Sequence, residues 1–412
     1  MAAPSYNDSL RGHGSPTSPP YSASAMDGER TLDPRASLSS PLTDLPDVYM
    51  FQSQRIKLDL GARIWPIDMP CYGRTNVVQG AVHVTTLKHV ERITVSVEGI
   101  ANASFMERGA LAEYIEITLF QQTVTLYASG ASSHNSTAIA SYPFAVTLPV
   151  TCDKSTRPLP PSFVFQLPGM SAEVLYRVRI DMSRSGLHRH ESLVAPVLYL
   201  PRSYTPQTSR DILLFDEQSS SRAQDPGMKE FHLKSKALSK NTSKSKPIPS
   251  AFVQSKIALP SPLIAASGDR IPFTITISSE SPALAALYTD ITLQLVKLTK
   301  IKAYKKSLAK ETIISSGEVY GSEQRGGGMQ VLRGELGNGT PGAEASWSAA
   351  GIIEIKHVIR LSIKPPSIAS AAALSANLPT FESIIAVEIM THRDSRNDEE
   401  SFPALGLIGL TH

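Results

Sequence analysis

The sequence has little of several things that would each point to a particular class of protein. Its only two cysteines, Cys71 and Cys152, are spaced neither as a metal-binding pair nor as a redox pair, so a reducing compartment is expected. No stretch reaches the roughly 18 consecutive apolar residues of a membrane-spanning helix. The first residues also lack the basic and apolar regions of a secretory signal. The sequence therefore predicts a cytoplasmic protein.

An excess of charge is also missing. The formal net charge is +3 over 412 residues, which is too small to indicate wholesale nucleic-acid binding. Hydrophobic residues make up 41% of the chain, enough to form a core, and the length favours two folded units. The 30 prolines are expected in tails, loops and sheet edges, because proline cannot donate a backbone hydrogen bond.

Apolar residues alternate with polar residues in many short stretches separated by Gly, Pro, Ser and Asn. In one example, Ile93, Val95 and Val97 would face a core, and the polar residues between them would face outward. Helical periodicity is almost absent. This pattern predicts an all-β protein of two antiparallel, immunoglobulin-like β-sandwich domains.

Changes in composition divide the chain into segments. We expect a disordered tail at 1–49, a β-sandwich at 50–204, a Lys/Ser-rich linker or flexible loop at 205–249, a second sandwich at 250–395 with a Gly-rich insertion at about 315–348, and a short C-terminal tail at 396–412. Ser15, Ser18 and Ser40 each precede a proline in the first tail, and they are candidate phosphorylation sites.

Several motifs occur in the order found in one known family. PCYGRTNVVQGAVHV at 70–84, followed by ERITVSVEGI, resembles the opening of an arrestin N-terminal domain. YPFAVTLPV at 142–150, LPPSFVFQLPG at 159–169 and VLYRVRIDMSRSG at 174–186 are similar to an α-arrestin run, and SGDRIPFTITISSES resembles the opening of the arrestin C-terminal domain. The resemblance covers about 50–395 and is strongest at 65–186.

The resemblance implies a non-catalytic adaptor or scaffold that binds cytosolic segments of membrane transporters or receptors. Such a protein would take part in endocytosis, protein transport, ubiquitin-dependent trafficking or signal transduction, peripherally at the plasma membrane or at endosomes. The binding mode expected is an extended segment added to a strand edge or held between the domains.

Many α-arrestins recruit a ubiquitin ligase through a PPxY motif, and this sequence departs from that pattern. Pro19-Pro20-Tyr21 places the tyrosine one residue early, and Pro160-Pro161-Ser162-Phe163 has phenylalanine instead. A WW domain reads the aromatic ring at a fixed offset from the prolines. The resemblance therefore implies a ubiquitin ligase as a partner, but the sequence has no PPxY motif that would recruit one directly.

Two other classes of function stay open. One is a structural trafficking-coat subunit, similar to the arrestin-fold component of retromer, and the other is an enzyme. The sequence offers no catalytic, cofactor-binding or metal-binding set for an enzyme. One stretch, Gly337-Asn338-Gly339-Thr340-Pro341-Gly342, fits the GxGxxG pattern of dinucleotide-binding proteins. That motif must lie between a strand and a helix, which this stretch does not. Pro341 and the surrounding glycines predict a loop instead.

Two groups of cations are candidates for contact with phosphate or anionic membrane. The first is Arg177 and Arg179, on one face of a predicted strand. The second comprises Lys234, Lys236, Lys240, Lys244 and Lys246, for which a weak anionic-membrane contact and a solvated linker are both open. Ser239 and Ser243 lie among these lysines, so phosphorylation there would reduce the positive charge.

Overall fold

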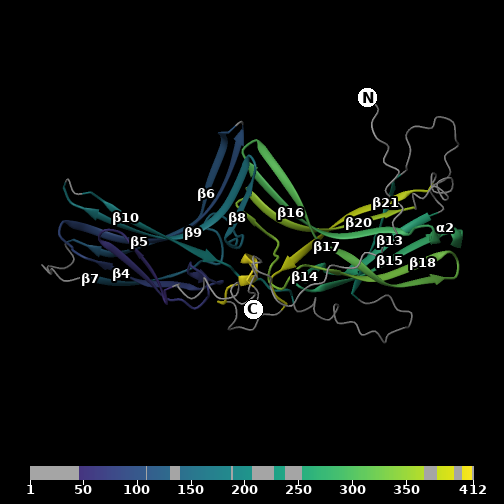
Figure 1. The fold of residues 1–412 in the computed structure, drawn as a ribbon, viewed down its shortest axis with the longest axis horizontal. Helices are drawn as coiled ribbons and strands as arrows, with labels where there is room; N and C mark the ends of the chain where they lie inside the picture. The colour runs from purple at the N-terminus through teal and green to yellow at the C-terminus, as the bar shows by residue number, and fades with distance from the viewer. Residues whose placement is uncertain are drawn as a thin grey trace, which may run out of the picture. The chain divides into compact units, whose positions relative to one another are not determined.

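The computed structural model describes residues 46–107, 109–129, 140–186, 189–206, 227–236, 253–365, 378–393 and 401–410 of the chain. Asp47–His412 forms one compact unit. The described residues are nearly all β, with antiparallel sheets, which confirms the predicted class at that level (Figure 1). Among them are a short helix, α2 (Pro282–Ala286), and a 3-10 turn, η4 (Leu405–Ile408). No helix within these ranges is long and apolar enough to cross a membrane.

Two sheets form the first half of the unit. The four-stranded sheet has the order β1 (Val48–Gln52), β2 (Ile56–Ala62), β4 (Val77–Val84) and β7 (Ala140–Thr147). The other sheet has the order β3 (Cys71–Tyr72), β10 (Glu191–Tyr199), β9 (Met170–Arg184), β5 (Val90–Glu107) and β6 (Ala110–Ala128), and β8 (Phe163–Leu167) pairs with β9. Val82, Val95 and Val178 from the two sheets share one apolar core.

Strand β5 is buried on both faces. Ile93, Val95 and Val97 are in the core as predicted, but the alternate residues Ser96 and Glu98 are only 5% and 7% exposed. β5 lies between β6 and β9, and both polar side chains have partners there: Ser96 Oγ lies 2.8 Å from Thr123 Oγ1 on β6, and Arg177 Nε on β9 donates to Glu98 Oε1 over 2.5 Å. This differs from the half-buried strand that the alternation indicated.

One large sheet, close to a closed barrel, forms the second half. Its order is β11 (Met228–His232), β13 (Val253–Pro260), β15 (Arg270–Ser279), β18 (Met329–Gly337), β17 (Lys306–Arg325), β16 (Asp290–Ala303), β20 (Ile353–Lys364), β21 (Thr380–Met390) and β12 (Lys234–Lys236). The short strands β14 (Ile264–Ala266) and β19 (Trp347–Ala349) pair with β21 and β20.

Strand β17 passes from one neighbour to another and so bends the sheet. It pairs with β16 up to Ser316 and with β18 from Gly317 onward. A Cβ atom at Gly317 would lie 3.0 Å from Leu293 and 3.2 Å from Phe273, both of which are core side chains. The absence of a side chain at this position allows the two parts of the sheet to close over their core.

Parts of two segments predicted as irregular are strands. Met228–His232 and Lys234–Lys236, within the predicted 205–249 linker, form β11 and β12 because Leu233 between them is buried in the second core. The alternation of Phe231 and Leu233 was obscured by the surrounding lysines. Much of the predicted 315–348 insertion likewise belongs to β17 and β18.

The apolar core of the first half continues into the second. Ile301 and Ala303 at the end of β16, together with Ile352 and Ile353 where β20 begins, pack in the same cluster as the first two sheets. At the surface, Lys306 Nζ lies 2.8 Å from Glu107 Oε2. The two halves therefore meet through an apolar contact, and we call this region the junction.

Candidate functional site: a cavity at the junction

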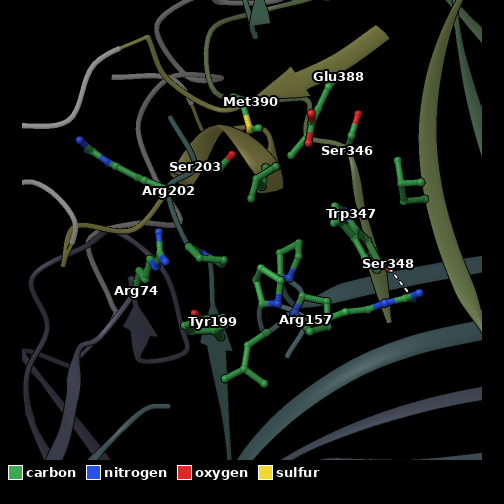
Figure 2. A pocket seen from close by; sticks show the side chains of 18 of the residues that line it. Arg74, Arg157, Tyr199, Arg202, Ser203, Ser346, Trp347, Ser348, Glu388 and Met390 are labelled. Atoms are coloured by element: carbon green, nitrogen blue, oxygen red, sulfur yellow. Dashed lines mark hydrogen bonds between the residues drawn. The ribbon is translucent and has the colours of Figure 1, made fainter. Parts of the chain in front are cut away.

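A cavity of about 480 Å³, which we call the junction cavity, opens where the two halves meet (Figure 2). Leu159, Pro160 and Tyr199 from the first half line one side, and Trp347 and Met390 from the second half line the other. The walls are largely apolar, with a few polar groups. Cavities of this size and composition are typical of ligand-binding sites in proteins.

Backbone hydrogen bonds fix the proline-rich wall. Leu159 N–H donates to Val150 O over 3.2 Å, and Ser162 N–H donates to Tyr199 O over 2.7 Å. The Tyr176 hydroxyl donates to Pro160 O over 2.5 Å. Because proline has no N–H, Pro158, Pro160 and Pro161 add no backbone donor that would need a partner in this wall.

Two reciprocal hydrogen bonds link the opposite side of the cavity to the first half. Ser203 N–H donates to Thr391 Oγ1 over 2.7 Å, and Thr391 N–H donates to Ser203 Oγ over 3.0 Å. These residues follow the last strands of the two halves, β10 and β21. Side chains from segments far apart in the sequence are therefore held around one space.

Cations outnumber acids among the lining residues. The cations are Arg74, Arg157, Arg202 and Lys356, and the acids are Glu354 and Glu388. Arg157 Nη1 donates to Ser348 Oγ over 3.2 Å, and Lys356 pairs with Glu354 at 2.8 Å. Burial raises the pKa of Tyr199 to about 12, with Arg74 acting in the opposite direction. The site can hold an apolar group beside an anionic one.

A second cavity of about 410 Å³ adjoins the first. The two share a partition made of Pro161, Ala345, Trp347, Ile355 and Leu407, all of which line both cavities. The Trp347 ring packs edge-on against Phe163, with ring centres 5.0 Å apart. The position of Trp347 therefore decides the shape of both spaces.

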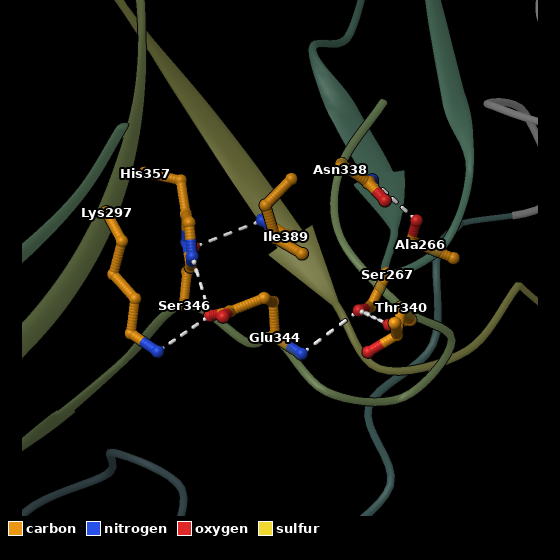
Figure 3. A network of polar contacts seen from close by, with 9 residues as sticks. All are labelled: Ala266, Ser267, Lys297, Asn338, Thr340, Glu344, Ser346, His357 and Ile389. Carbon is orange, nitrogen blue, oxygen red and sulfur yellow. Dashed lines mark hydrogen bonds and ion pairs between the residues drawn. The ribbon is translucent and has the colours of Figure 1, made fainter. Parts of the chain in front are cut away.

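A buried polar network joins Glu344 and Ser346, the sequence neighbours of the partition residue Ala345, to His357 (Figure 3). The His357 side chain is fully buried, with Nδ1 2.9 Å from Ser346 Oγ and Nε2 3.2 Å from Glu344 Oε2. Lys297 Nζ lies 2.8 Å from the same Glu344 oxygen. Burial raises the pKa of Glu344, but the hydrogen bond with His357 and the charge of Lys297 outweigh it and hold that pKa below its ordinary value.

The predicted GxGxxG loop leads into this network, and it is a loop in the structure as expected. Asn338 is fully buried and donates from Nδ2 to Ala266 O over 2.6 Å. Ser267 Oγ donates to Thr340 O over 2.6 Å and accepts Glu344 N–H over 3.0 Å. The loop thus positions Glu344 and the partition, and nothing in its contacts indicates a phosphate site.

The predicted arginines lie outside both cavities. Arg177 and Arg179 share the outward face of β9, as the alternation indicated. Arg177 Nε is 2.5 Å from Glu98 Oε1, and Arg179 Nε is 2.9 Å from Asp181 Oδ2. Each is therefore already engaged by a carboxylate, and phosphate contact at these residues stays a prediction.

Only two lysines of the second candidate group lie within the described residues. Lys234 and Lys236 are exposed on β12, where Lys236 pairs with Glu382 at 3.5 Å. The remaining candidates lie outside the described residues, namely Lys240, Lys244, Lys246, Ser15, Ser18, Ser40, Ser239 and Ser243. Within the described ranges, no three His, Cys, Asp or Glu side chains are grouped closely enough to hold a metal ion.

The junction cavity was not predicted from the sequence. The segments around Arg74 and Pro160 were recognised only as parts of a family-like motif, and Trp347 and His357 carried no signal of their own. A cavity formed by contacts between distant strands has no local sequence pattern. No family model matches the chain, and no curated protein matches it significantly.

Proposed function

We propose that this chain is a non-catalytic, arrestin-like adaptor made of two immunoglobulin-like β-sandwiches. Its ligand is an extended cytosolic segment of a membrane transporter or receptor, bound at the junction cavity. It acts in the cytoplasm, peripherally at the plasma membrane or at endosomes, in endocytosis, protein transport or signalling.

The observation that carries this proposal is the junction cavity. Its aromatic and proline walls suit an apolar side chain, while Arg74, Arg157 and Lys356 suit a neighbouring carboxylate or phosphate. The second cavity across the Trp347 partition offers room for another side chain of the same segment. The all-β fold and the order of the family-like motifs support the arrestin-like interpretation.

Affinity purification of the full chain from its own cells tests the proposal. The informative variants are Trp347→Ala and the double variant Arg74→Glu with Arg157→Glu. The matched control reverses the charge of two exposed arginines that line neither cavity, in the double variant Arg92→Glu with Arg325→Glu. We expect recovery of membrane proteins to fall by about tenfold in the cavity variants, which equals about 1.4 kcal/mol, and to stay unchanged in the control.

Two results would contradict the proposal. Equal recovery of membrane proteins by all variants would place their binding elsewhere on the chain. Recovery of a fixed, stoichiometric set of coat proteins, unaffected by the cavity variants, would favour the structural coat subunit.

A further inference from the structure

The hairpin formed by β16 and β17 ends in a strongly basic segment. Residues 300–310 contain no acid and five lysines, namely Lys300, Lys302, Lys305, Lys306 and Lys310. Ala303 pairs with Lys306, so Tyr304 and Lys305 form the two-residue loop between the strands. The end of this hairpin lies near the top of Figure 1, beside the end of β6. Positive charge is therefore concentrated at one place on the protein surface.

The first half of the unit engages two of these lysines. Lys306 Nζ lies 2.8 Å from Glu107 Oε2 at the end of β5. Lys310 Nζ lies 5.6 Å from the centre of the Phe165 ring on β8. These contacts hold the end of the β16–β17 hairpin beside the end of the β5–β6 hairpin.

The other three lysines keep their charge uncompensated. Lys300, Lys302 and Lys305 are exposed, and no carboxylate in the described part of the chain forms an ion pair with any of them. The acid that lies opposite Lys300 on β20, Glu354, pairs with Lys356 at 2.8 Å instead. Three positive charges are thus available to an anionic partner.

Tyr304 has a backbone conformation that the fold alone does not explain. Its φ is 46°, and the residue is 65% exposed. A positive φ at the first position of a two-residue hairpin loop favours glycine, which has no Cβ atom to clash. Because the exposed ring gains little from packing, the strain at Tyr304 is not offset within the protein. Strained residues of this kind are concentrated at binding sites, where the side chain contacts a ligand.

Apolar side chains are exposed around the same point. Leu308 on β17 is 41% exposed, and Met106 and Leu111 near the end of the β5–β6 hairpin are 52% and 63% exposed. Tyrosine and apolar residues among lysines are typical of protein segments that lie at a membrane surface. The aromatic ring lies at the level of the lipid headgroups, and the lysines are attracted to anionic lipids.

We propose that residues 300–310, together with Met106 and Leu111, form a hairpin tip that binds the surface of an anionic lipid bilayer. Its uncompensated lysines contact the lipid phosphates, and Tyr304 enters the headgroup layer. No residue of the hairpin tip lines either cavity, whereas a peptide side chain needs a concave pocket. A lipid surface therefore suits the hairpin tip better than a peptide does. The hairpin tip extends the proposed function, because it gives the adaptor a second binding surface apart from the junction cavity.

The first test measures sedimentation of the full chain with lipid vesicles that contain no protein. The vesicles are phosphatidylcholine alone, or phosphatidylcholine with about 30% phosphatidylserine. We expect attachment only to the second kind, and weaker attachment at about 0.5 M salt than at about 0.1 M, since salt screens the lysines. Attachment to both kinds alike, or to neither, would overturn the proposal. Because no peptide is present, failure of attachment and failure of peptide binding at the cavity are separate results.

Two variants of the hairpin tip test which side chains carry the attachment. Each lysine near an anionic surface strengthens attachment about fivefold, so Lys300→Gln with Lys302→Gln and Lys305→Gln should weaken it at least about tenfold. Tyr304→Gly removes the ring and suits the positive φ, so the fold is retained while attachment falls about threefold or more. If both variants attach as well as the unchanged protein, the membrane contact lies elsewhere, as in the lysine-rich segment at 234–246.

The matched control removes the same charge away from the hairpin tip. Lys57, Lys88 and Lys364 are exposed. Lys88 precedes the start of β5, and Lys364 is the last residue of β20, so each lies at the strand end opposite to the hairpin tip. Changing all three to Gln should leave attachment unchanged. A loss equal to that of the hairpin-tip variant would mean that net charge, and not this surface, determines attachment.

The second test locates the bilayer relative to the chain. Tyr304→Trp places a fluorescent ring in the hairpin tip, and Val319→Trp places one on β17 at a position that is 47% exposed. Vesicles with brominated acyl chains should quench the first variant, beyond the signal of Trp65 and Trp347, and should leave the second unquenched. Equal quenching of both would contradict the assignment. If the hairpin-tip variants lose membrane-protein recovery while no variant attaches to vesicles, the partner is a protein and not a lipid surface.

Discussion

Two arginines that look alike in the sequence have different surroundings in the structure. Arg177 pairs with Glu98, whose side chain is 9% exposed, whereas Arg179 pairs with Asp181, whose side chain is 37% exposed. Removing the partner of a buried carboxylate destabilises the fold, because the carboxylate charge is then left buried and unpaired. An exposed pair contributes little, because water and salt screen it.

We therefore expect Arg177→Ala to lower the free energy of unfolding by about 1–3 kcal/mol. The matched variant Arg179→Ala should lower it by no more than about 1 kcal/mol. Urea denaturation of both variants at neutral pH measures this difference. An equal loss of stability in the two variants would mean that the burial of Glu98 does not determine how much its ion pair contributes.

The pKa of Glu344 gives a prediction about stability and pH. Its pKa is lower in the folded protein than the ordinary value of 4.5, so the ionised carboxylate stabilises the fold above that pH. The contribution is lost as the pH falls through the lowered folded pKa. Glu344→Gln should destabilise the protein by about 1–3 kcal/mol near neutral pH, with a smaller difference from the unchanged protein in acid.

Denaturation at a series of pH values tests this, with Glu318→Gln as the control. Glu318 pairs with Arg270 at 3.4 Å, and its side chain is 76% exposed, so its replacement should have little effect throughout. The prediction is contradicted if the stability difference between Glu344→Gln and the unchanged protein grows as the pH falls.

Among the strands, β11 and β12 change the interpretation of the lysine-rich segment. Leu233 is 8% exposed and packs in the second core, and its N–H donates to Ser255 O over 2.9 Å. Leu233→Ala should therefore cost about 2–4 kcal/mol. Ser235→Ala, on the exposed strand β12, should change stability by no more than about 0.5 kcal/mol. If both variants behave as surface substitutions in denaturant, the segment is only a linker.

The strands were largely predictable because apolar alternation is local. Ile93, Val95 and Val97 face the core as expected, and so do the residues that alternate with Arg177 and Arg179. The burial of Ser96 and Glu98 was not predictable, since their partners Thr123 and Arg177 lie on the neighbouring strands β6 and β9. The site was not predictable either, because Arg157 in a loop of the first half meets Ser348 on β19 of the second half, 191 residues further along the chain.

For the whole molecule, the junction is the feature that links fold and proposed function. Ile301, Ala303 and Ile353 of the second half are buried in the core of the first, so the walls of the cavity are held by a common apolar contact. The 3-10 turn η4 adds Leu407 to the partition, and Ala404 N–H donates to Leu200 O over 2.8 Å. Three separate parts of the chain therefore build one site.

Site-specific photo-crosslinking in the protein's own cells tests the central claim most directly. A photoreactive phenylalanine replaces Val150, which is 39% exposed and lines the junction cavity, or Val319, which is 47% exposed on β17 and lines neither cavity. The account predicts that Val150 crosslinks to cytosolic segments of membrane proteins, identified by mass spectrometry, and that Val319 does not. Crosslinks from both positions alike, or from Val319 alone, would contradict it.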